Sequence, residues 1–471
     1  MGVMDLAGML EHIHRMVWGP WTLAVFLGVG IYFSIRFGFF QVRGFCFWWS
    51  ATAGSLFKGE NNEADTRQGG RRDSEGERAG AVSQLQSVCT ALAATVGTGN
   101  IAGVATALAA GGPGALFWMW ISAFIGMITA YGETALGIRY RRGDGYGGYL
   151  CGPSVYIEQG LGMRGMGILY GFLCLMCSFG MGSMVQANAA LGTMAYAWNV
   201  PLLPGGILFT ALLGLVIMGG IRRIGTVAEK MMPAVSGIYI LFCLLVVLSS
   251  ADRIPAVLRA VLSAAFEPES AAGGVGGYMI SRGMRYGISR GVFSNEAGLG
   301  TLAILHGAAD RADPKQQGMW AMFEVFFDTV ILCTLTGLVI LCVAGTEPGA
   351  NPYQGAALAA WCFQRRLGAA GEHLVSASVV VFAFATAMAW YYMGKQAACY
   401  LAGGFRRGIF EQRIYPVLFL GAVFAGSQAQ LNLVWLLSDI WNGLMAFPNL
   451  TALLFLCGEI ELPNWKRKKE N

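Results

Sequence analysis

Two short runs of polar and glycine residues interrupt long apolar stretches of this 471-residue chain. The first, Val96–Asn100 (VGTGN), separates Cys89–Thr95 from Ile101–Ala110, and the second is Phe293–Gly298 (FSNEAG). Glycine lowers the cost of leaving helical geometry, and the freed N–H and C=O groups need partners that lipid cannot supply. Broken backbone at membrane depth is therefore expected only where it lines a cavity or binds a ligand. Two such breaks, one in each half of a chain, indicate the binding site of a secondary transporter.

The first break offers a surface for an anion. The half-helix Ile101–Ala110 begins at this break, so its N-terminal amides and the positive end of its dipole point at the membrane midplane. We expect the carboxylate of an amino acid here, with the amides of Gly99 and Asn100 and the hydroxyl of Thr98 as donors. Gly97 and Gly99 carry no side chains and let a ligand touch the backbone.

The second break offers a surface for a cation. Phe293 and Ser294 end a half-helix, so their carbonyl groups can receive an ammonium group, and Asn295 adds a neutral amide. For Asn100 and Asn295 a simpler role is equally open, because asparagine commonly caps helix ends through its side chain. A small zwitterion would fit between the two surfaces.

The composition is that of a polytopic membrane protein. The chain is 55% hydrophobic and 13% charged, whereas soluble domains carry about 25% charged residues. Its mean hydropathy is +0.54, and 67 glycines and 22 methionines suit closely packed transmembrane helices. The net charge of +5 does not indicate nucleic acid binding, because the basic residues lie between apolar segments. The eleven cysteines show no metal-ligand spacing, and we interpret them as packed thiols.

Eleven segments are long and apolar enough to cross a membrane. The N-terminus lacks a basic region and a cleavage site, so the first segment is expected to be a retained span rather than a signal peptide. A polar, glycine-rich segment, 58–80, is expected to be a flexible surface loop. The predicted spans are 18–37, 82–110, 113–138, 166–197, 203–221, 227–250, 276–309, 318–343, 374–402, 411–429 and 433–458.

The charges in the loops predict the orientation. With the N-terminus outside, the cytoplasmic segments hold 22 lysines and arginines and the outside segments hold 5. The opposite orientation would invert this ratio and violate the positive-inside rule. We therefore expect a multi-pass protein of the plasma (inner) membrane whose basic tail, 459–471, is cytoplasmic.

The ten spans after the first divide into two groups of five, and each group opens with a broken helix. Because five is odd, the second group enters the membrane from the opposite side, which is an inverted-topology repeat. A run of glycine-kinked helices without a repeat is the alternative. The expected units are 1–80 with the first helix and loop, 81–250 and 276–458 as the repeats, 251–275 as an external connector with a surface-lying helix, and 459–471 as the tail.

Long motifs around the breaks resemble the alanine or glycine:cation symporter family, and the resemblance covers nearly the whole chain. It implies sodium-coupled uptake of alanine or glycine on an all-α, leucine-transporter-type fold with an extra first helix. The motifs are ALAATVGTGNIAG (91–103), GGPGALFWMW (111–120), RGVFSNEAGLG (290–300), FEVFFDTVILCTLTGLVIL (323–341) and FAFATAMAWYYMGK (382–395).

The resemblance also implies a sodium site, formed by carbonyl groups of Ala93 to Val96 together with the Thr386 hydroxyl. The family usually has serine before that threonine, where this chain has Ala385, so one hydroxyl is missing. Two other departures are Lys395, where the family motif usually has glutamate, and the run Thr301–Leu305, which replaces small residues and proline.

Polar residues elsewhere in the spans have two readings. Gln186 and Asn188 lie in one lipid-length segment, where such residues usually bond to another helix; the resemblance raises substrate contact for Gln186 as an equal alternative. Candidates for the apolar wall of the pocket are Met181, Leu299 and Trp390, although plain packing is the commoner role of each residue type.

Ionisable residues inside spans are expensive and suggest pairing or function. Arg282 and Arg285 lie near a helix end, where snorkelling to the interface is expected. Glu296 lies in the second break, where it could stabilise the unwound backbone, pair with a basic residue or take a coupling proton; the structural pairing is favoured. The others are Glu133, Asp328, Asp439, Arg290, His306 and Lys395.

Other functional classes fit less well. A channel would need rings of like residues or an oligomeric pore, and an enzyme would need a nucleophile paired with a base; neither pattern occurs. No cofactor is expected beyond sodium as the coupling ion, and the transporter is expected to work as a monomer in the lipid bilayer. A proton-coupled symporter or an exchanger of small amino acids on the same fold is the nearest alternative.

Overall fold

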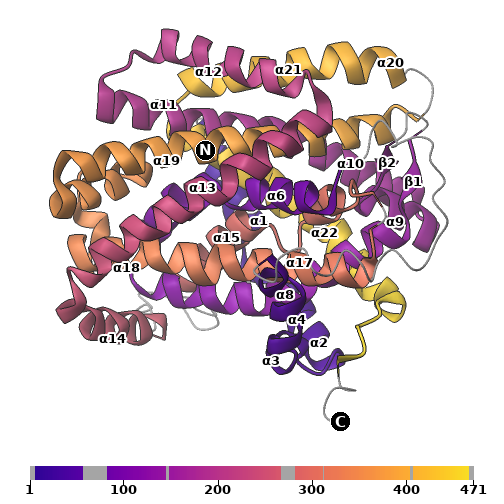
Figure 1. Ribbon diagram of the computed structural model, residues 1–471, viewed down its shortest axis with the longest axis horizontal. Coiled ribbons are helices and arrows are strands. Elements are labelled where there is room, and N and C mark those ends of the chain that lie inside the picture. The colour runs from indigo at the N-terminus through magenta and orange to yellow at the C-terminus, as the bar shows by residue number, and fades with distance from the viewer. Residues whose placement is uncertain are drawn as a thin grey trace, which may run out of the picture.

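The computed structural model describes residues 6–56, 82–144, 148–266, 282–310, 312–403 and 407–465 (Figure 1). The expected surface loop 58–80, most of the charged tail and the end of the connector lie outside these residues. In the described part, the regular secondary structure is helical apart from one antiparallel pair of two-residue strands, β1 (Arg142–Gly143) and β2 (Tyr149–Leu150), and an isolated bridge between Val82 and Ala309. The all-α expectation is confirmed.

The helices follow the chain in this order. Up to the connector they are α1 (Leu6–Val17), α2 (Pro20–Arg36), α3 (Phe40–Arg43), α4 (Phe45–Ala51), α5 (Ala53–Leu56), α6 (Gln84–Thr95), α7 (Ala102–Gly111), α8 (Gly114–Arg139), α9 (Pro153–Leu161), α10 (Arg164–Phe179), α11 (Val185–Trp198), α12 (Leu202–Ile217), α13 (Gly220–Leu248) and α14 (Ile254–Ala265). After it come α15 (Arg282–Asn295), α16 (Thr301–His306), α17 (Pro314–Val325), α18 (Thr334–Ala344), α19 (Gly355–Leu401), α20 (Arg407–Ile409), α21 (Tyr415–Gln428) and α22 (Leu431–Leu456).

Helices lie in each of the eleven segments predicted to cross the membrane. Seven are long and apolar enough to span it by themselves, and α6 with α7 makes an eighth that bends by 46° at its break. The other three predicted spans contain shorter pieces: α12, the pair α15 and α16, and α21. The longest helix, α19, is kinked at Gly368, where φ is 66°.

The two halves repeat one order of elements. A helix broken in its middle (α6–α7 or α15–α16) is followed by a long helix (α8 or α17–α18). A second long helical segment (α10–α11 or α19) and two more helices (α12 and α13, or α21 and α22) complete each half. Two of the long segments contain π-helical turns, at Gly180–Met184 between α10 and α11 and at Phe326–Cys333 between α17 and α18.

Helix α8 packs against both half-helices of the second break and against α17 (Figure 1). Its contact with α15 depends on three glycines spaced four residues apart, Gly283, Gly287 and Gly291, which share one helical face. A methyl group on Gly287 would overlap the Ala115 carbonyl oxygen and lie 2.7 Å from Trp118 Cβ. Small residues thus let two backbones approach closely, as is typical of membrane helices.

This packing makes a prediction for Gly287→Ala. The added methyl group forces α15 away from α8, and such overpacking costs about 1–3 kcal/mol. We expect a lower midpoint of thermal unfolding for the purified protein in detergent. The matched control is Gly237→Ala in α13, where no atom lies within 4 Å of the new Cβ. It should leave the midpoint unchanged or raise it, because alanine favours helix by about 1 kcal/mol. Equal midpoints for the two variants would contradict the packing argument.

Candidate functional site

The first break is a tight turn held together by its own asparagine. Helix α6 ends at Thr95, and residues 98–100 form a single 3₁₀ turn before α7. The Gly97 amide donates to Asn100 Oδ1 (2.8 Å), and the Asn100 amide donates to the Gly97 carbonyl (3.3 Å). Of the two amides expected to bind an anion, that of Asn100 is therefore engaged. Within the described residues, the amides of Thr98 and Gly99 have no hydrogen-bond acceptor.

The second break is built in a similar way. Helix α15 ends at Asn295, and the chain then passes through left-handed backbone at Glu296 (φ 57°), Gly298 (φ 91°) and Gly300 (φ 80°). In a continued helix the Ala297 amide would donate to the Phe293 carbonyl. It donates instead to Asn295 Oδ1 (3.1 Å), which leaves the carbonyl end of α15 open.

Side chains on neighbouring helices donate hydrogen bonds to backbone carbonyl groups of the second break. The Asn449 amide group on α22 donates to the Gly298 carbonyl (2.9 Å) and to Glu133 Oε1 on α8 (2.6 Å). The Tyr170 hydroxyl on α10 donates to the Leu299 carbonyl (2.8 Å). Nothing in the local sequence of Asn449 or Tyr170 marks these residues as partners of a distant break.

Glu296 corrects one expectation. Its side chain is fully buried, and Oε1 accepts a hydrogen bond from the indole N–H of Trp390 (2.8 Å) on α19 rather than pairing with a basic residue. The second break is thereby attached to the helix that also carries Thr386. Trp390 itself is fully buried, and a methyl group on Gly182 of the first half would overlap it.

The two breaks touch each other. A methyl group on Gly99 would lie 3.1 Å from Ser294 Cα and 3.2 Å from Ser294 Oγ. The unpartnered amides of the first break and the open carbonyl end of α15 therefore lie side by side at this contact. The polar side chains at this junction are at most 1% exposed, so the junction is closed to both sides of the molecule in this conformation.

Asp328 joins the breaks and comes from neither of them. Its Oδ1 accepts from Asn100 Nδ2 (2.6 Å) and from Ser294 Oγ (3.1 Å). Its Oδ2 accepts from the Thr329 hydroxyl (2.7 Å), which in turn accepts from Asn295 Nδ2 (3.0 Å). Asn100 and Asn295 thus each cap their own break with the side-chain oxygen. With the side-chain nitrogen, Asn100 donates to Asp328 and Asn295 donates to Thr329. The sequence analysis named Asp328 only as an ionisable residue in a span and missed Thr329.

Gln186 contacts the first break, and Asn188 does not. The Thr98 hydroxyl donates to Gln186 Oε1 (2.9 Å), whose amide group donates to the Met181 carbonyl (3.0 Å) in the π-helical turn. Asn188 donates to the carbonyls of Gly426 and Ala429 at the end of α21, so its role is structural. One of the two polar residues in this span therefore faces the breaks.

The residues expected to hold sodium are also brought together. The Thr386 hydroxyl donates to the Ala93 carbonyl (2.9 Å), although α6 and α19 lie far apart in the sequence. Gly97 packs directly against Thr386, because a methyl group there would overlap the hydroxyl oxygen. Val96 is fully buried at the end of α6.

A cavity of about 520 Å³ lies on the side of the molecule where α7 ends and α15 begins. We call it the vestibule; Arg285, Tyr286 and Tyr353 are among its lining residues. Arg285, which the sequence places near the outer end of its helix, lines this cavity. Arg282 lines a separate hollow beside it.

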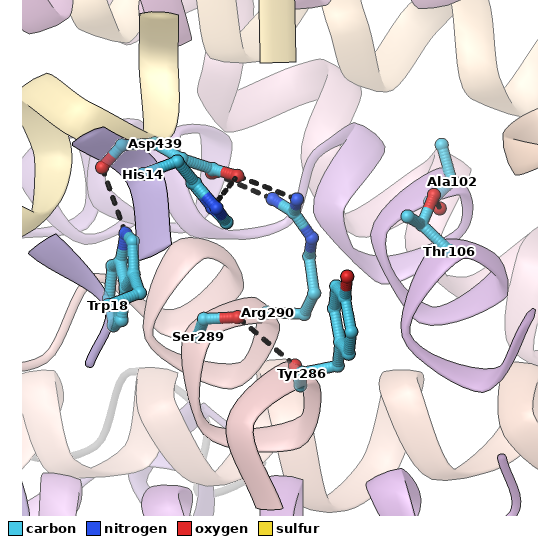
Figure 2. A network of polar contacts seen from close by, with 8 residues as sticks. All are labelled: His14, Trp18, Ala102, Thr106, Tyr286, Ser289, Arg290 and Asp439. Carbon is cyan, nitrogen blue, oxygen red and sulfur yellow. Dashed lines mark hydrogen bonds and ion pairs between the residues drawn. The ribbon is translucent and has the colours of Figure 1, made fainter. Parts of the chain in front are cut away.

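The vestibule is lined at one place, which we call its floor, by an ion pair between Arg290 and Asp439 (Figure 2). Arg290 lies four residues, about one helical turn, before Ser294 on α15. Arg290 on α15 donates to both carboxylate oxygens of Asp439 on α22, at 2.8 and 2.7 Å. His14 Nε2 lies 3.3 Å from the same carboxylate, and the Trp18 indole donates to the Asp439 carbonyl (2.9 Å). The N-terminal helix therefore closes this network. Both charges are visible in the sequence, but nothing in the sequence pairs them.

A second buried network lies on the opposite side of the second break. The two nitrogens of His306 on α16 face Gln317 Oε1 (2.7 Å) and Glu324 Oε2 (3.0 Å), and all three side chains are fully enclosed. Glu324 lies inside a predicted span and was missed by the sequence analysis. Lys395 is half-buried on α19.

Comparison with known proteins agrees with this architecture. The model of the sodium:alanine symporter family matches residues 4–470. The chain belongs to this family. The symporter is 38% identical to the sodium/alanine symporter AgcS of Methanococcus maripaludis over 466 residues, which is 97% of this chain and 96% of AgcS. It is 33% identical to the probable sodium/glutamine symporter GlnT of Bacillus subtilis over 469 residues, 98% of this chain and 92% of GlnT.

A solved structure supports the fold. The symporter resembles MhsT, crystallised with L-phenylalanine, with a TM-score of 0.52 over 81% of this chain and 99% of MhsT, at 16% identity. MhsT is a membrane transporter of the leucine-transporter fold. The expected family and fold class are thus confirmed, and the family consists of transporters rather than enzymes.

The vestibule floor yields a second prediction. Removing one partner of a buried ion pair leaves an uncompensated charge and costs about 3–5 kcal/mol, whereas replacing both by apolar residues is often nearly neutral. We expect Arg290→Met and Asp439→Leu each to lower the thermal midpoint strongly, and the double variant to lose much less than the sum. The two effects would simply add if the pair contributed no coupling energy.

Proposed function

We propose that this symporter imports alanine or glycine together with sodium by alternating access. The observation that carries the proposal is the contact between the breaks at Gly99 and Ser294. It sets the unpartnered amides of Thr98 and Gly99 beside the carbonyl end of α15. A carboxylate would take the first surface and an ammonium group the second.

The proposed substrate site uses residues from four elements. The apolar side of the pocket is supplied by Trp390, and the Thr98–Gln186 hydrogen bond ties the first break to α11. Because these side chains are buried, the substrate can enter only when the helices around the breaks separate, which is what alternating access requires. The full set is Gly97, Thr98, Gly99, Asn100, Gln186, Phe293, Ser294, Asn295 and Trp390.

Sodium is proposed to bind at Ala93, Val96 and Thr386. Carbonyl and hydroxyl oxygens are suitable ligands for a hard cation, and the contact between Thr386 and Ala93 brings two of them together. The similarity to AgcS, a sodium/alanine symporter, supports both the ion and the substrate. Proton coupling is the second candidate, because Ala385 supplies no hydroxyl at this site.

The loop charges support a plasma (inner) membrane protein with residues 1–16 outside and 459–471 in the cytoplasm. In that orientation the vestibule opens to the outside, which suits import. Each chain contains both breaks, so we propose that a monomer is sufficient for transport.

The proposal predicts concentrative uptake of radiolabelled alanine into proteoliposomes under an inward sodium gradient. A protonophore should leave this uptake intact, and liposomes in choline chloride should show none. Unlabelled glycine should compete, while leucine and phenylalanine should not, because the contact at Gly99 leaves little room beyond a methyl group. One methylene in such a pocket changes binding by about 1–3 kcal/mol. Uptake driven by a proton gradient without sodium would show that sodium is not the coupling ion. Strong transport of leucine would show that the substrate is not restricted to alanine and glycine.

A further prediction concerns the sodium ligands. Thr386→Val keeps the shape of the side chain and removes its oxygen, so the sodium concentration for half-maximal uptake should rise about tenfold or more. Ala385→Ser should act in the opposite direction by adding a hydroxyl. Alanine affinity should fall with sodium affinity in the valine variant, because coupled sites affect one another reciprocally. If neither variant alters the sodium dependence, the ion does not bind at Thr386.

A further inference from the structure

Arginines gather at the end of the molecule where β1, β2 and α9 lie, on the right of Figure 1, and they differ in how well they are paired. Arg139 forms an ion pair of 3.0 Å with a carboxylate of the C-terminal segment, and Arg141 donates to two backbone carbonyls. Arg142 on β1 and Arg164 at the start of α10 share one carboxylate, Glu158 on α9, at 3.7 and 4.0 Å. Both distances exceed that of a hydrogen bond, so most donors of these two guanidinium groups have no acceptor among the described residues.

Arg142 and Arg164 line a cavity of about 390 Å³ together with the end of α19. Tyr400 on α19 forms part of its wall and is only 8% exposed. The Tyr400 hydroxyl has no hydrogen-bond partner among the described residues, although the Glu158 carboxylate lies near it. A buried hydroxyl without a partner is costly. An anion that displaced Glu158 from the arginines would supply the missing hydrogen bond.

The chemistry of this cavity suits a phosphate group. The planar guanidinium of arginine matches phosphate oxygens with paired N–H donors, and the two arginines exceed the charge of Glu158 by one unit. The backbone amides in the first turn of α10 have no acceptor within the helix, and the positive end of the helix dipole favours an anion there. The Tyr400 hydroxyl can donate to a phosphate oxygen.

The surface beside the cavity favours a lipid as the source of this phosphate. Arg164, Ile168 and Phe172 are spaced four residues apart and so lie on one face of α10. Ile168, Leu169 and Phe172 are 45–50% exposed, and Ile168 also lines the cavity. A headgroup in the cavity would therefore lay its acyl chains along an exposed apolar stripe. In the proposed orientation this end faces the cytoplasmic leaflet, where basic pockets between helices bind anionic headgroups.

We propose that Arg142, Arg164 and Tyr400 bind the phosphate of an anionic phospholipid in the cytoplasmic leaflet. The phosphate replaces Glu158, whose side chain is 26% exposed and can turn toward water. Because β1 follows α8 and Tyr400 lies at the end of α19, the headgroup joins α8, α10 and α19 at one end of the molecule. The lipid thereby holds helices of the two halves together. This site is separate from both breaks and is independent of the proposed substrate and coupling ion.

The test uses the full-length protein purified in a neutral detergent, with the thermal midpoint measured as phosphatidylglycerol is added. A lipid that binds the folded protein raises this midpoint. Phosphatidylcholine carries the same phosphate beside a cancelling cation, and inorganic phosphate carries no acyl chains. We expect phosphatidylglycerol to reach half-saturation at a concentration at least about tenfold below that of either. An equal response to phosphatidylcholine, or no response to phosphatidylglycerol, would overturn the inference. An equal response to inorganic phosphate would overturn the lipid as its source.

Variants test the cavity itself. Arg142→Gln combined with Arg164→Gln should raise the half-saturating concentration of phosphatidylglycerol about tenfold or more, because charge-assisted hydrogen bonds are lost. Tyr400→Phe removes only the hydroxyl and should raise that concentration about threefold or more. Glu158→Gln removes the competing charge and should lower it. A structural role for these residues would not make the Glu158 variant bind more tightly than the unaltered protein.

The matched control is Arg36→Gln combined with Arg43→Gln. Both arginines are exposed, the loop charges place them on the same side of the membrane, and neither lines the cavity. This variant should keep the original half-saturating concentration. If the double cavity variant does not fold, Arg164→Gln alone serves, because the Arg164 side chain is 74% exposed. The inference is overturned if the folded cavity variant saturates within about twofold of the original, or if the control loses as much.

Discussion

The architecture depends on one constraint, which is that two stretches of non-helical backbone lie inside a protein built for a membrane. Their N–H and C=O groups cannot rely on lipid, so each must find a partner in the protein or be reserved for a ligand. The structure uses both solutions. Asparagine side chains cap both breaks locally, and side chains on α8, α10 and α22 form further hydrogen bonds around the second break. Two amides of the first break and the carbonyl end of α15 have no partner among the described residues and face the junction. The open groups are the ones that suit a zwitterion.

The same constraint connects the two halves of the molecule. Asp328 and Thr329 accept hydrogen bonds from side chains of both breaks. On α19, the Thr386 hydroxyl donates to a carbonyl just before the first break, and the Trp390 indole donates to Glu296 in the second break. These hydrogen bonds are few and fully enclosed, so each is strong relative to any alternative in a dry site. A movement that opens the junction must exchange several of them together. This concentration of polar contacts in one layer, with apolar packing elsewhere, is well suited to an amino-acid symporter that alternates between closed and open states.

Charge is distributed around this layer in pairs. Arg290 and Asp439 lie between the junction and the vestibule, and His306 and Glu324 lie beyond the second break. Each pair is neutral when both members are ionised, which limits the cost of burying it. The extra N-terminal helix contributes His14 and Trp18 to the first pair, so it takes part in the closure of the vestibule as well as in packing.

Much of this could be predicted from the sequence, for a physical reason. Hydropathy, glycine positions and loop charges are local properties, and they predicted an all-α membrane protein with helices in eleven segments and two breaks. The family motifs extended this to the contact of Thr386 with Ala93, which the structure contains. The Gly97–Asn100 turn is also local, since its asparagine caps residues within the same turn.

Tertiary structure alone decided which distant polar groups meet. Asp328 and Asn100 are 228 positions apart, and Arg290 and Asp439 are 149 apart, so no periodicity or spacing in the chain relates them. The sequence therefore identifies these charges without their partners, predicts a basic residue beside Glu296 where Trp390 lies, and cannot name the helix to which Asn188 bonds. Side-chain pairing in a membrane protein depends on how helices rotate and cross, and that is set by packing of the whole bundle rather than by any one segment.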